Sequence, residues 1–298
     1  MITNKKLISN KNINQIYSFL NKTKFSAHNS YVKRKLFLNI ILSLIIPTFI
    51  VAFSTPPKQG SLVFCAEKSS VNKQLKMAIV IDDFGYDRVG VEEMLNINCP
   101  LTCAVMPCLP YSMEDSQKAK EKGHEVILHM PMEAYGNLPE SWYGSTYIKT
   151  TDSKAEVEQK LQASLESIGG AKLMNIHMGT AVSQNRAVMT DILSFCKDKS
   201  ITFLDSRTIE NTVCKEVGDS LNTKVLERDI FLEVNSRPSI HFAKQRIAEA
   251  IELCKKQGSV IVIGHIGPVG SNQTAQAIKE SLETIKSAGI QIVPLSQI

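Results

Sequence analysis

The sequence predicts an α/β protein of parallel strands covered by helices, and two patterns carry that prediction. From residue 76 to the end of this 298-residue chain, short apolar runs alternate with amphipathic segments. The runs at residues 78–81 and 260–263 are apolar throughout, as strands covered on both faces require. Strands separated by helices form parallel βαβ units. About eight such units in some 220 residues fit either a barrel or a large doubly wound sheet.

Each expected element has its own signal. Strands are expected at residues 77–81, 101–106, 125–128, 173–176, 201–204, 224–226, 259–263 and 291–293. Helical patterns lie near residues 87–96, 111–122, 153–168, 186–199, 208–221, 239–257 and 272–288. The third helix has Asp152 or Ser153 available as its N-cap, and the last two helices end at Gly258 and Gly289.

The first 35 residues carry the positive charge of the chain. They contain eight Lys or Arg and no acidic residue, which leaves 26 basic against 29 acidic side chains in the remainder. A nucleic-acid-binding domain carries its positive charge on the folded body, so no nucleic acid is expected as a partner. The sequence also contains no Gly-x-Gly-x-x-Gly after the first strand and no Gly-Lys-Ser/Thr phosphate loop, so no nucleotide is expected.

Residues 36–53 form an uncharged apolar segment directly after this basic arm. Their number is close to the 20 or so residues that a membrane-spanning helix needs. The preceding Lys33-Arg34-Lys35 assigns residues 1–35 to the cytoplasm and the rest of the chain to the other side of the membrane. The segment is expected to be a retained anchor helix, with a cleaved signal peptide ending near residues 52–54 as the alternative.

The remainder divides into a linker and one domain. Residues 54–75 are rich in Ser, Pro, Lys and Gln and are expected to form a flexible linker. Residues 76–298 are expected to form a single extracytoplasmic domain, either anchored to the cell membrane or secreted after cleavage. The seven Cys residues show no paired metal-binding spacing, and no disulfide pairing follows from them.

Side chains able to bind metal or transfer protons close most of the expected strands. After the first, third, fourth, fifth and seventh strands these are Asp82-Asp83, His129, His177, Asp205 and His265. Catalytic residues of α/β barrels lie at the carboxyl ends of strands. Residues far apart in the sequence are therefore expected to converge on one rim.

Asp83, His129 and His177 have the composition of a catalytic metal site. Two His and one carboxylate, with one position left open for water, form a common zinc arrangement. Such an ion lowers the pKa of bound water to about 7 and polarises a carbonyl oxygen. Each residue also has an ordinary structural alternative, because an Asp after a strand is often a helix N-cap and a His in an apolar strand is often a hydrogen-bonded core residue.

Adjacent carboxylates permit a division of labour. Asp83 binds the ion while Asp82 accepts a proton from water, because close charges push the two pKa values apart. His265 is the candidate general acid, since His titrates in the useful range.

Other polar and aromatic residues receive secondary roles. Asp205, Asn175 and Arg207 are expected to bind substrate. His124 begins a strand instead of ending one and is expected to be structural. Trp142 and its neighbour Tyr143 either stack on a sugar ring or pack on the barrel rim.

Five stretches of the sequence carry a family resemblance. They are Ile81-Asp82-Asp83-Phe84-Gly85, Gly123-His124-Glu125-Val126 with His129-Met130-Pro131-Met132-Glu133, Asn175-Ile176-His177-Met178-Gly179-Thr180, Phe203-Leu204-Asp205-Ser206 and Ile263-Gly264-His265. In this order they resemble the divergent polysaccharide deacetylases, relatives of the carbohydrate esterases, over roughly residues 76–298. The resemblance implies an irregular (β/α)7 barrel of the NodB-like type.

The same resemblance implies roles for individual residues. Asp82 corresponds to the catalytic base, Asp83 and His129 to metal ligands, and His265 to the general acid. The second His of the superfamily's His-x-x-x-His motif is absent, and Glu133 stands in its place. His177 is the candidate replacement ligand, and Glu133 is the alternative.

The expected function is a metal-dependent hydrolase that deacylates an N-acyl amino sugar of the cell envelope. Its cofactor is a divalent metal, and the His/His/Asp set favours zinc. One alternative is a non-enzymatic glycan-binding or envelope-scaffolding protein on a decayed deacetylase barrel. Another is a metal hydrolase of peptides or phosphoesters.

Overall fold

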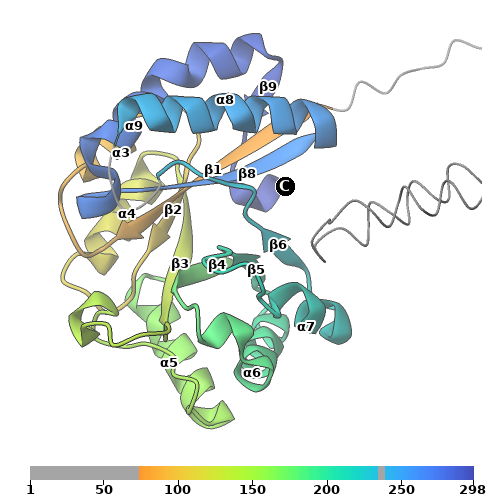
Figure 1. Cartoon of the computed structure of the whole chain (residues 1–298). Helices are drawn as coiled ribbons and strands as arrows, with labels where there is room; N and C mark the ends of the chain where they lie inside the picture. The colour runs from red at the N-terminus through yellow and green to blue at the C-terminus, as the bar shows by residue number, and fades with distance from the viewer. Residues whose placement is uncertain (1–73, 234–238) are drawn as a thin grey trace, which may run out of the picture. The chain divides into compact units, whose positions relative to one another are not determined.

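The computed structural model describes residues 74–233 and 239–298 (Figure 1). Its strands are β1 (Leu75–Phe84), β2 (Thr102–Val105), β3 (Glu125–Met132), β4 (Leu173–Met178), β5 (Thr202–Asp205), β6 (Val225–Glu227), β7 (Ile230–Phe231), β8 (Ser259–His265) and β9 (Ile290–Ile292). Its helices are α3 (Val91–Leu95), α4 (Ser112–Glu121), α5 (Lys154–Ser167), α6 (Arg186–Asp198), α7 (Cys214–Leu221), α8 (Ile240–Gln257) and α9 (Gly267–Ser287).

One parallel sheet contains the nine strands of the described residues. Its order is β6-β5-β4-β3-β2-β1-β8-β7, and β9 also pairs with β1. The two end strands, β6 and β7, are separated in the sequence only by Arg228 and Asp229. The Arg228 N–H donates to the Asp205 carbonyl and the Asp229 N–H donates to the Ile261 carbonyl. This short crossing draws the two edges together, so the sheet curls into an open barrel with helices outside it (Figure 1).

Strand side chains alternate between two apolar layers, because neighbouring residues of a strand point to opposite faces. The inner layer consists of Ala78, Val80, Ala104, Ile127, Leu173, Leu204, Ile261, Ile263 and Leu295. The outer layer lies between the strands and the helices and includes Ile79 and Ile81 of β1. Burial on both faces explains why these strands are apolar throughout instead of alternating.

The inner layer becomes polar at one level of the barrel. Two residues beyond the apolar inner positions Val80, Ile127, Leu173 and Ile263 lie Asp82, His129, Asn175 and His265. His177 follows Asn175 by two further residues on β4. The apolar interior therefore ends in a polar floor, which forms the base of the site.

Helix caps position the elements around this barrel. Ser153 accepts the Glu156 N–H, and the Glu156 carboxylate accepts the Ser153 N–H, which forms a capping box at the start of α5. The Ser239 side chain accepts the Phe242 N–H at the start of α8, and this helix ends at Gly258 with φ 91°. The predicted N-cap of α5 at Ser153 and the predicted end of α8 at Gly258 are confirmed.

The expected parallel α/β architecture is confirmed, with local corrections. β3 continues to Met132, so His129 lies within this strand and not at its end. It still belongs to the rim, because the neighbouring β2 ends at Val105, opposite Leu128. α7 begins at Cys214 and not near residue 208, and the last helix extends back to residue 267 with a break at Ser271.

The predicted N-terminal parts lie outside the described residues. These are the basic arm at 1–35, the apolar segment at 36–53 and nearly all of the linker at 54–75. Between residues 74 and 233 and between 239 and 298, no helix combines the length and hydropathy needed to cross a bilayer. The anchor or signal peptide stays a prediction.

Candidate active site

A distortion at the end of β1 brings two adjacent carboxylates to the same cavity. Asp82 and Asp83 would point to opposite faces of a regular strand. The register between β1 and β2 shifts between Ile81 and Phe84, and Asp83 adopts a left-handed φ of 75°. Such a bulge redirects a side chain. Asp82 keeps its inner position while Asp83 also turns toward the cavity.

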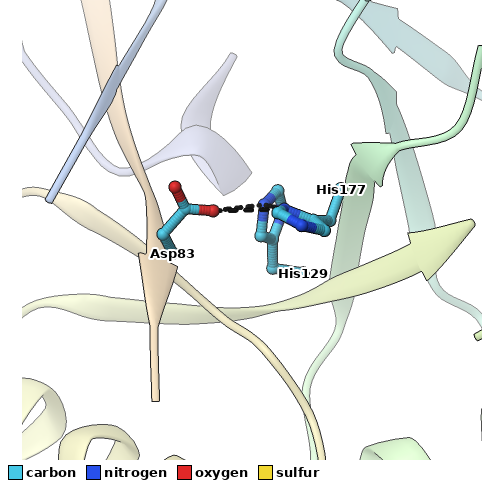
Figure 2. Close-up of side chains that lie close together, drawn as sticks. All are labelled: Asp83, His129 and His177. Atoms are coloured by element: carbon cyan, nitrogen blue, oxygen red, sulfur yellow. Dashed lines mark hydrogen bonds and ion pairs between the residues drawn. The ribbon is translucent and has the colours of Figure 1, made fainter. Parts of the chain in front are cut away.

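Asp83, His129 and His177 form a compact triangle of possible ligand atoms (Figure 2). Oδ1 of Asp83 lies 3.3 Å from Nε2 of His129 and 3.1 Å from Nδ1 of His177. The two imidazole nitrogens are 3.1 Å apart. The residues come from β1, β3 and β4, and Figure 2 shows their three side chains lying close together.

A hydrogen bond to the buried side chain of Asn175 fixes the tautomer of His129. Asn175 donates from Nδ2 to Oδ1 of Asp82 at 2.8 Å, so its own Oδ1 is the acceptor for Nδ1 of His129 at 2.7 Å. In its neutral form, His129 therefore carries its proton on Nδ1. Its Nε2 presents a lone pair to Asp83.

A hydrogen bond to a backbone carbonyl fixes the tautomer of His177 in a similar way. Nε2 of His177 lies 3.0 Å from the carbonyl oxygen of Trp142, which can only accept. The proton of neutral His177 is therefore on Nε2, and its Nδ1 lone pair faces Asp83. Second-shell bonds of this kind orient metal-binding imidazoles in proteins.

When both imidazoles are neutral, three lone-pair atoms thus converge with no proton between them. Oδ1 of Asp83 is buried and receives no hydrogen bond from the described residues. A tetrahedral zinc ion, with ligands about 2.0–2.1 Å away, holds its ligand atoms roughly 3.3 Å apart. The observed separations of 3.1–3.3 Å fit an ion of this size. The arrangement leaves a position open toward the cavity.

The electrostatics of the cluster favour a cation. Burial opposes the charge of Asp83, but His129 and His177 outweigh this effect and hold the pKa of Asp83 well below its usual range. Burial likewise opposes the charged form of His129, yet Asp82 and Asp83 raise its pKa above the ordinary value. Without an ion, a proton on His129 is stabilised by the negative charges of Asp82 and Asp83. Protons and a metal ion therefore compete for this site.

A hydrogen-bonded pair faces the cluster from β8. Nδ1 of His265 lies 2.9 Å from Oε2 of Glu233, and the other oxygen of Glu233 accepts from the Thr274 hydroxyl and the His265 N–H. Burial lowers the pKa of His265, but Glu233 outweighs burial and raises it to about 9. His265 is therefore cationic at neutral pH. Asp82 is its register partner on β1.

Asp82 has the opposite character to Asp83. Burial raises the pKa of Asp82, and the nearby His129 and His265 offset this effect only in part. The two adjacent carboxyl groups consequently differ in basicity, as the sequence predicts. One is suited to stay ionised beside a cation, and the other is suited to accept a proton.

One cavity of about 320 Å³ joins these groups. Its polar lining includes Asp82, Asp83, His129, His177, Ser206, Thr208, Glu233 and His265. Ile176, Met178, Phe231 and Val269 supply apolar walls. A pocket with a few convergent polar groups on apolar walls is typical of a small-molecule site.

None of the three predicted substrate-binding residues lines this cavity. Asn175 is fully buried beneath His129 with both amide atoms bonded, so it supports the site from below. Asp205 follows Leu204, an inner residue, and therefore points outward, where it accepts from the Arg207 N–H and the Thr212 hydroxyl. Arg207 does not line the cavity and pairs with Glu227 at 3.5 Å.

Glu133, the alternative ligand, is also outside the cluster. One of its oxygens accepts from both the N–H and the hydroxyl of Thr150 at 2.6 Å. It lines a separate polar hollow together with Tyr135 and Asn185. His124 is buried between two backbone groups, the N–H of Leu101 and the carbonyl of Leu95, which agrees with a structural role.

Sequence reasoning missed Glu233 and the Trp142 carbonyl. Glu233 comes two residues after β7, a strand of only two residues that the sequence does not predict. The apolar run Ile230-Phe231-Leu232 before this acidic residue resembles the signal that identified Asp82, but three residues are too few for periodicity to establish a strand. No sequence signal identifies a backbone carbonyl as a partner of His177.

The fold and the site define an open parallel α/β barrel with a His/His/Asp cluster at its carboxyl rim. The chain belongs to the divergent polysaccharide deacetylase family, whose model matches residues 79–298. The family resemblance found in the sequence is thereby confirmed.

Two relatives and one solved structure are similar to this chain. The chain is 31% identical over 193 residues to the uncharacterized protein YibQ of Escherichia coli, covering 65% of this chain but only 59% of YibQ. It is also 31% identical over 233 residues to an uncharacterized Haemophilus influenzae protein, covering 78% of this chain and 77% of the relative. A crystal structure of an uncharacterized Agrobacterium tumefaciens protein superimposes with a TM-score of 0.69 at 16% identity, covering 76% and 90% of the two chains, which is similarity of fold.

Proposed function

We propose that this protein is a metal-dependent hydrolase that removes the acyl group from an N-acyl amino sugar of the cell envelope. One observation carries the proposal: three possible ligand atoms, from Asp83, His129 and His177, lie within 3.3 Å of one another beside a basic carboxylate and a cationic imidazole. Membership in the divergent polysaccharide deacetylases supports the choice of a carbohydrate substrate and of hydrolysis.

Asp83, His129 and His177 are the proposed ligands of the metal. The His/His/Asp donor set and the ligand separations favour zinc over the hard ions that prefer oxygen ligands. When bound, such an ion supplies Lewis acidity, which polarises a carbonyl oxygen and promotes the ionisation of water.

Asp82 is the proposed general base. Its carboxylate is buried and lines the cavity, and one of its oxygens is held by the Asn175 amide. Its raised pKa makes it a stronger proton acceptor than an exposed Asp. Asn175 therefore positions the base and a metal ligand with the two ends of one amide.

His265 is the proposed general acid. Glu233 holds its Nδ1 and keeps the ring protonated at neutral pH, which leaves the Nε2 proton available to the cavity. Protonation of the departing amine of an amide requires a donor of this kind. Asp82 and His265 are register partners on adjacent strands, so base and acid lie side by side.

The place of action is proposed to be outside the cytoplasmic membrane. The basic arm at 1–35 and the apolar segment at 36–53 support an anchor or an export signal for the domain that follows. An envelope glycan is the carbohydrate available there.

Acetate release tests this proposal. The full-length chain, loaded in turn with zinc, cobalt or nickel, is incubated with N-acetylglucosamine oligomers and peptidoglycan fragments. We expect release by the metal-loaded protein, and loss of release in Asp82→Asn with the metal content unchanged. Full activity of Asp82→Asn would exclude the proposed base. Glycan binding without release, unaffected by His129→Ala, would favour the glycan-binding or scaffolding alternative.

A further inference from the structure

The loop between β3 and α5 connects the ligand cluster to the protein surface. Trp142, at the end of the short helix η1 (Glu140–Trp142), accepts the bond from Nε2 of His177 through its backbone carbonyl. The other nitrogen of the same imidazole faces Asp83. The imidazole of His177 therefore lies between the Trp142 carbonyl and Asp83. Trp142 itself does not line the cavity.

The loop is anchored by residues next to Trp142. Tyr143 is only 4% exposed, and its ring stacks on that of Tyr147 with 4.4 Å between centroids. The Tyr143 hydroxyl also accepts the N–H of Ala134, which joins the two ends of the loop. Ile148 then pairs with the end of β3. These contacts anchor the loop through residues on both sides of Trp142.

The indole of Trp142 is 56% exposed. Burial of so large an apolar side chain normally contributes to folding, so its exposure on an anchored loop calls for another role. Tyr135 on the same loop is 58% exposed, and its backbone N–H is held by the Thr180 hydroxyl. Tyr135 lines the separate hollow beside Glu133, so Trp142 is the exposed aromatic residue of this loop that is bonded to the ligand cluster.

We propose that Trp142 is the sugar-stacking residue of this site and holds a pyranose ring of the glycan whose acyl group enters the cavity. The inference rests on the proposed function. A pyranose ring has a flat face of C–H groups and a polar edge, and an indole offers a flat apolar face with a polar edge of its own. The stacking residue thereby lies on the same loop that orients the ligand His177.

The size of the cavity supports this placement. Its volume of about 320 Å³ is at the small end for sites that bind small molecules. A glycan of several sugars that inserts one acyl group there continues over the rim. The backbone carbonyl of Trp142 is bonded to the cavity residue His177, which puts this exposed residue next to the cavity.

Intrinsic fluorescence tests the contact directly, because the chain contains a single tryptophan. The N-acetylglucosamine trimer is titrated into the full-length wild-type chain, and binding is measured in parallel by calorimetry. We expect a saturable change in tryptophan emission with the same midpoint as the calorimetric curve. Calorimetric binding with unchanged emission would overturn the proposal.

Two substitutions separate stacking from support of the loop. Trp142→Ala keeps the backbone carbonyl, so we expect metal content and kcat to stay within about twofold while Kd and KM for the trimer rise about tenfold. Trp142→Phe keeps an aromatic face and is expected to lose less affinity. Met113→Ala removes an exposed apolar side chain from α4 and serves as the control. Unchanged Kd and KM in Trp142→Ala, or loss of metal together with binding, would contradict a stacking role.

Failure of this inference is distinguishable from failure of the proposed function. A wild-type chain that takes up no metal and releases no acetate contradicts the proposed hydrolase. Calorimetry of the trimer with wild type and Trp142→Ala still decides the stacking role in that case. An active wild type whose affinity is unchanged by Trp142→Ala contradicts the stacking role alone.

Discussion

The two sides of the cavity, the ligand side with Asp83, His129 and His177 and the acid side with His265 and Glu233, differ in how their polar atoms are satisfied. On the ligand side, His129 and His177 each have one nitrogen satisfied by the protein, and their other nitrogens face Oδ1 of Asp83. On the acid side, His265 and Glu233 satisfy each other, and Thr274 completes the network.

The ligand side depends on an added cation, and the acid side does not. Buried polar atoms in native proteins are nearly always satisfied, and each exception calls for an explanation. The ligand side becomes satisfied when a cation is present. The acid side is already complete and holds its proton through the charge of Glu233. Substitutions on the two sides should therefore change different observables.

Removal of a ligand is expected to have the largest effect. Asp83→Ala deletes the only anionic ligand, so metal affinity should fall more than the roughly 100-fold that loss of a second-shell partner can cause. Competition with a chromophoric chelator measures this affinity, and thermal unfolding checks that the variant folds. An affinity within tenfold of wild type would remove Asp83 from the proposed ligand set.

Substitution of Asn175, the hydrogen-bond partner of the ligand His129, is expected to have the next largest effect on metal affinity. Asn175→Leu keeps the approximate volume but removes the bond that fixes the His129 tautomer, so metal affinity should fall about 10–100-fold. The same chelator competition applies. Loss of activity without loss of metal would mean that Asn175 acts on Asp82 alone, through its other bond.

Substitutions on the acid side should change the pH dependence of activity and leave the metal content unchanged. Because the pKa of His265 is raised to about 9, its protonated form persists through neutrality, and activity is expected to fall as the pH rises through about 9. Glu233→Gln removes the charge that raises this pKa, so the alkaline limb should move down by about one to three pH units. The pH profile of kcat measures the shift, with metal content as the control. An unmoved limb would show that His265 is not the group that titrates there.

The smallest effect is expected at Glu133. Glu133→Gln keeps an oxygen to accept from Thr150 and lies outside the triangle of ligand atoms. Metal affinity should stay within about twofold of wild type, because the substitution touches neither a ligand nor its hydrogen-bond partner. A large loss of metal would restore Glu133 as the alternative ligand in place of His177.

Most of the fold and of the ligand cluster could be predicted from the sequence, because both follow from simple periodicities. Apolar runs locate the strands, and polar residues at their carboxyl ends locate the rim. The two-residue alternation, counted back from each polar residue, also separates inner from outer positions. It places Asp82 and His265 inside, in phase with Val80 and Ile263, and Asp205 outside.

Three features could not be predicted in this way. The bulge that redirects Asp83 violates the alternation, and the local sequence does not announce its left-handed φ. Glu233 depends on a strand too short to give a pattern. The support of His177 comes from a backbone carbonyl, which any residue possesses, so only the path of the loop to Trp142 reveals it.

The metal content of the full-length chain tests the central claim most directly. The protein is incubated with zinc, dialysed and analysed by plasma mass spectrometry, for wild type and for His177→Ala. We expect about one zinc per wild-type chain and its loss from His177→Ala, since three protein ligands hold the ion. A folded wild type that takes up no zinc, cobalt or nickel, or a His177→Ala variant that retains wild-type metal, would contradict the account.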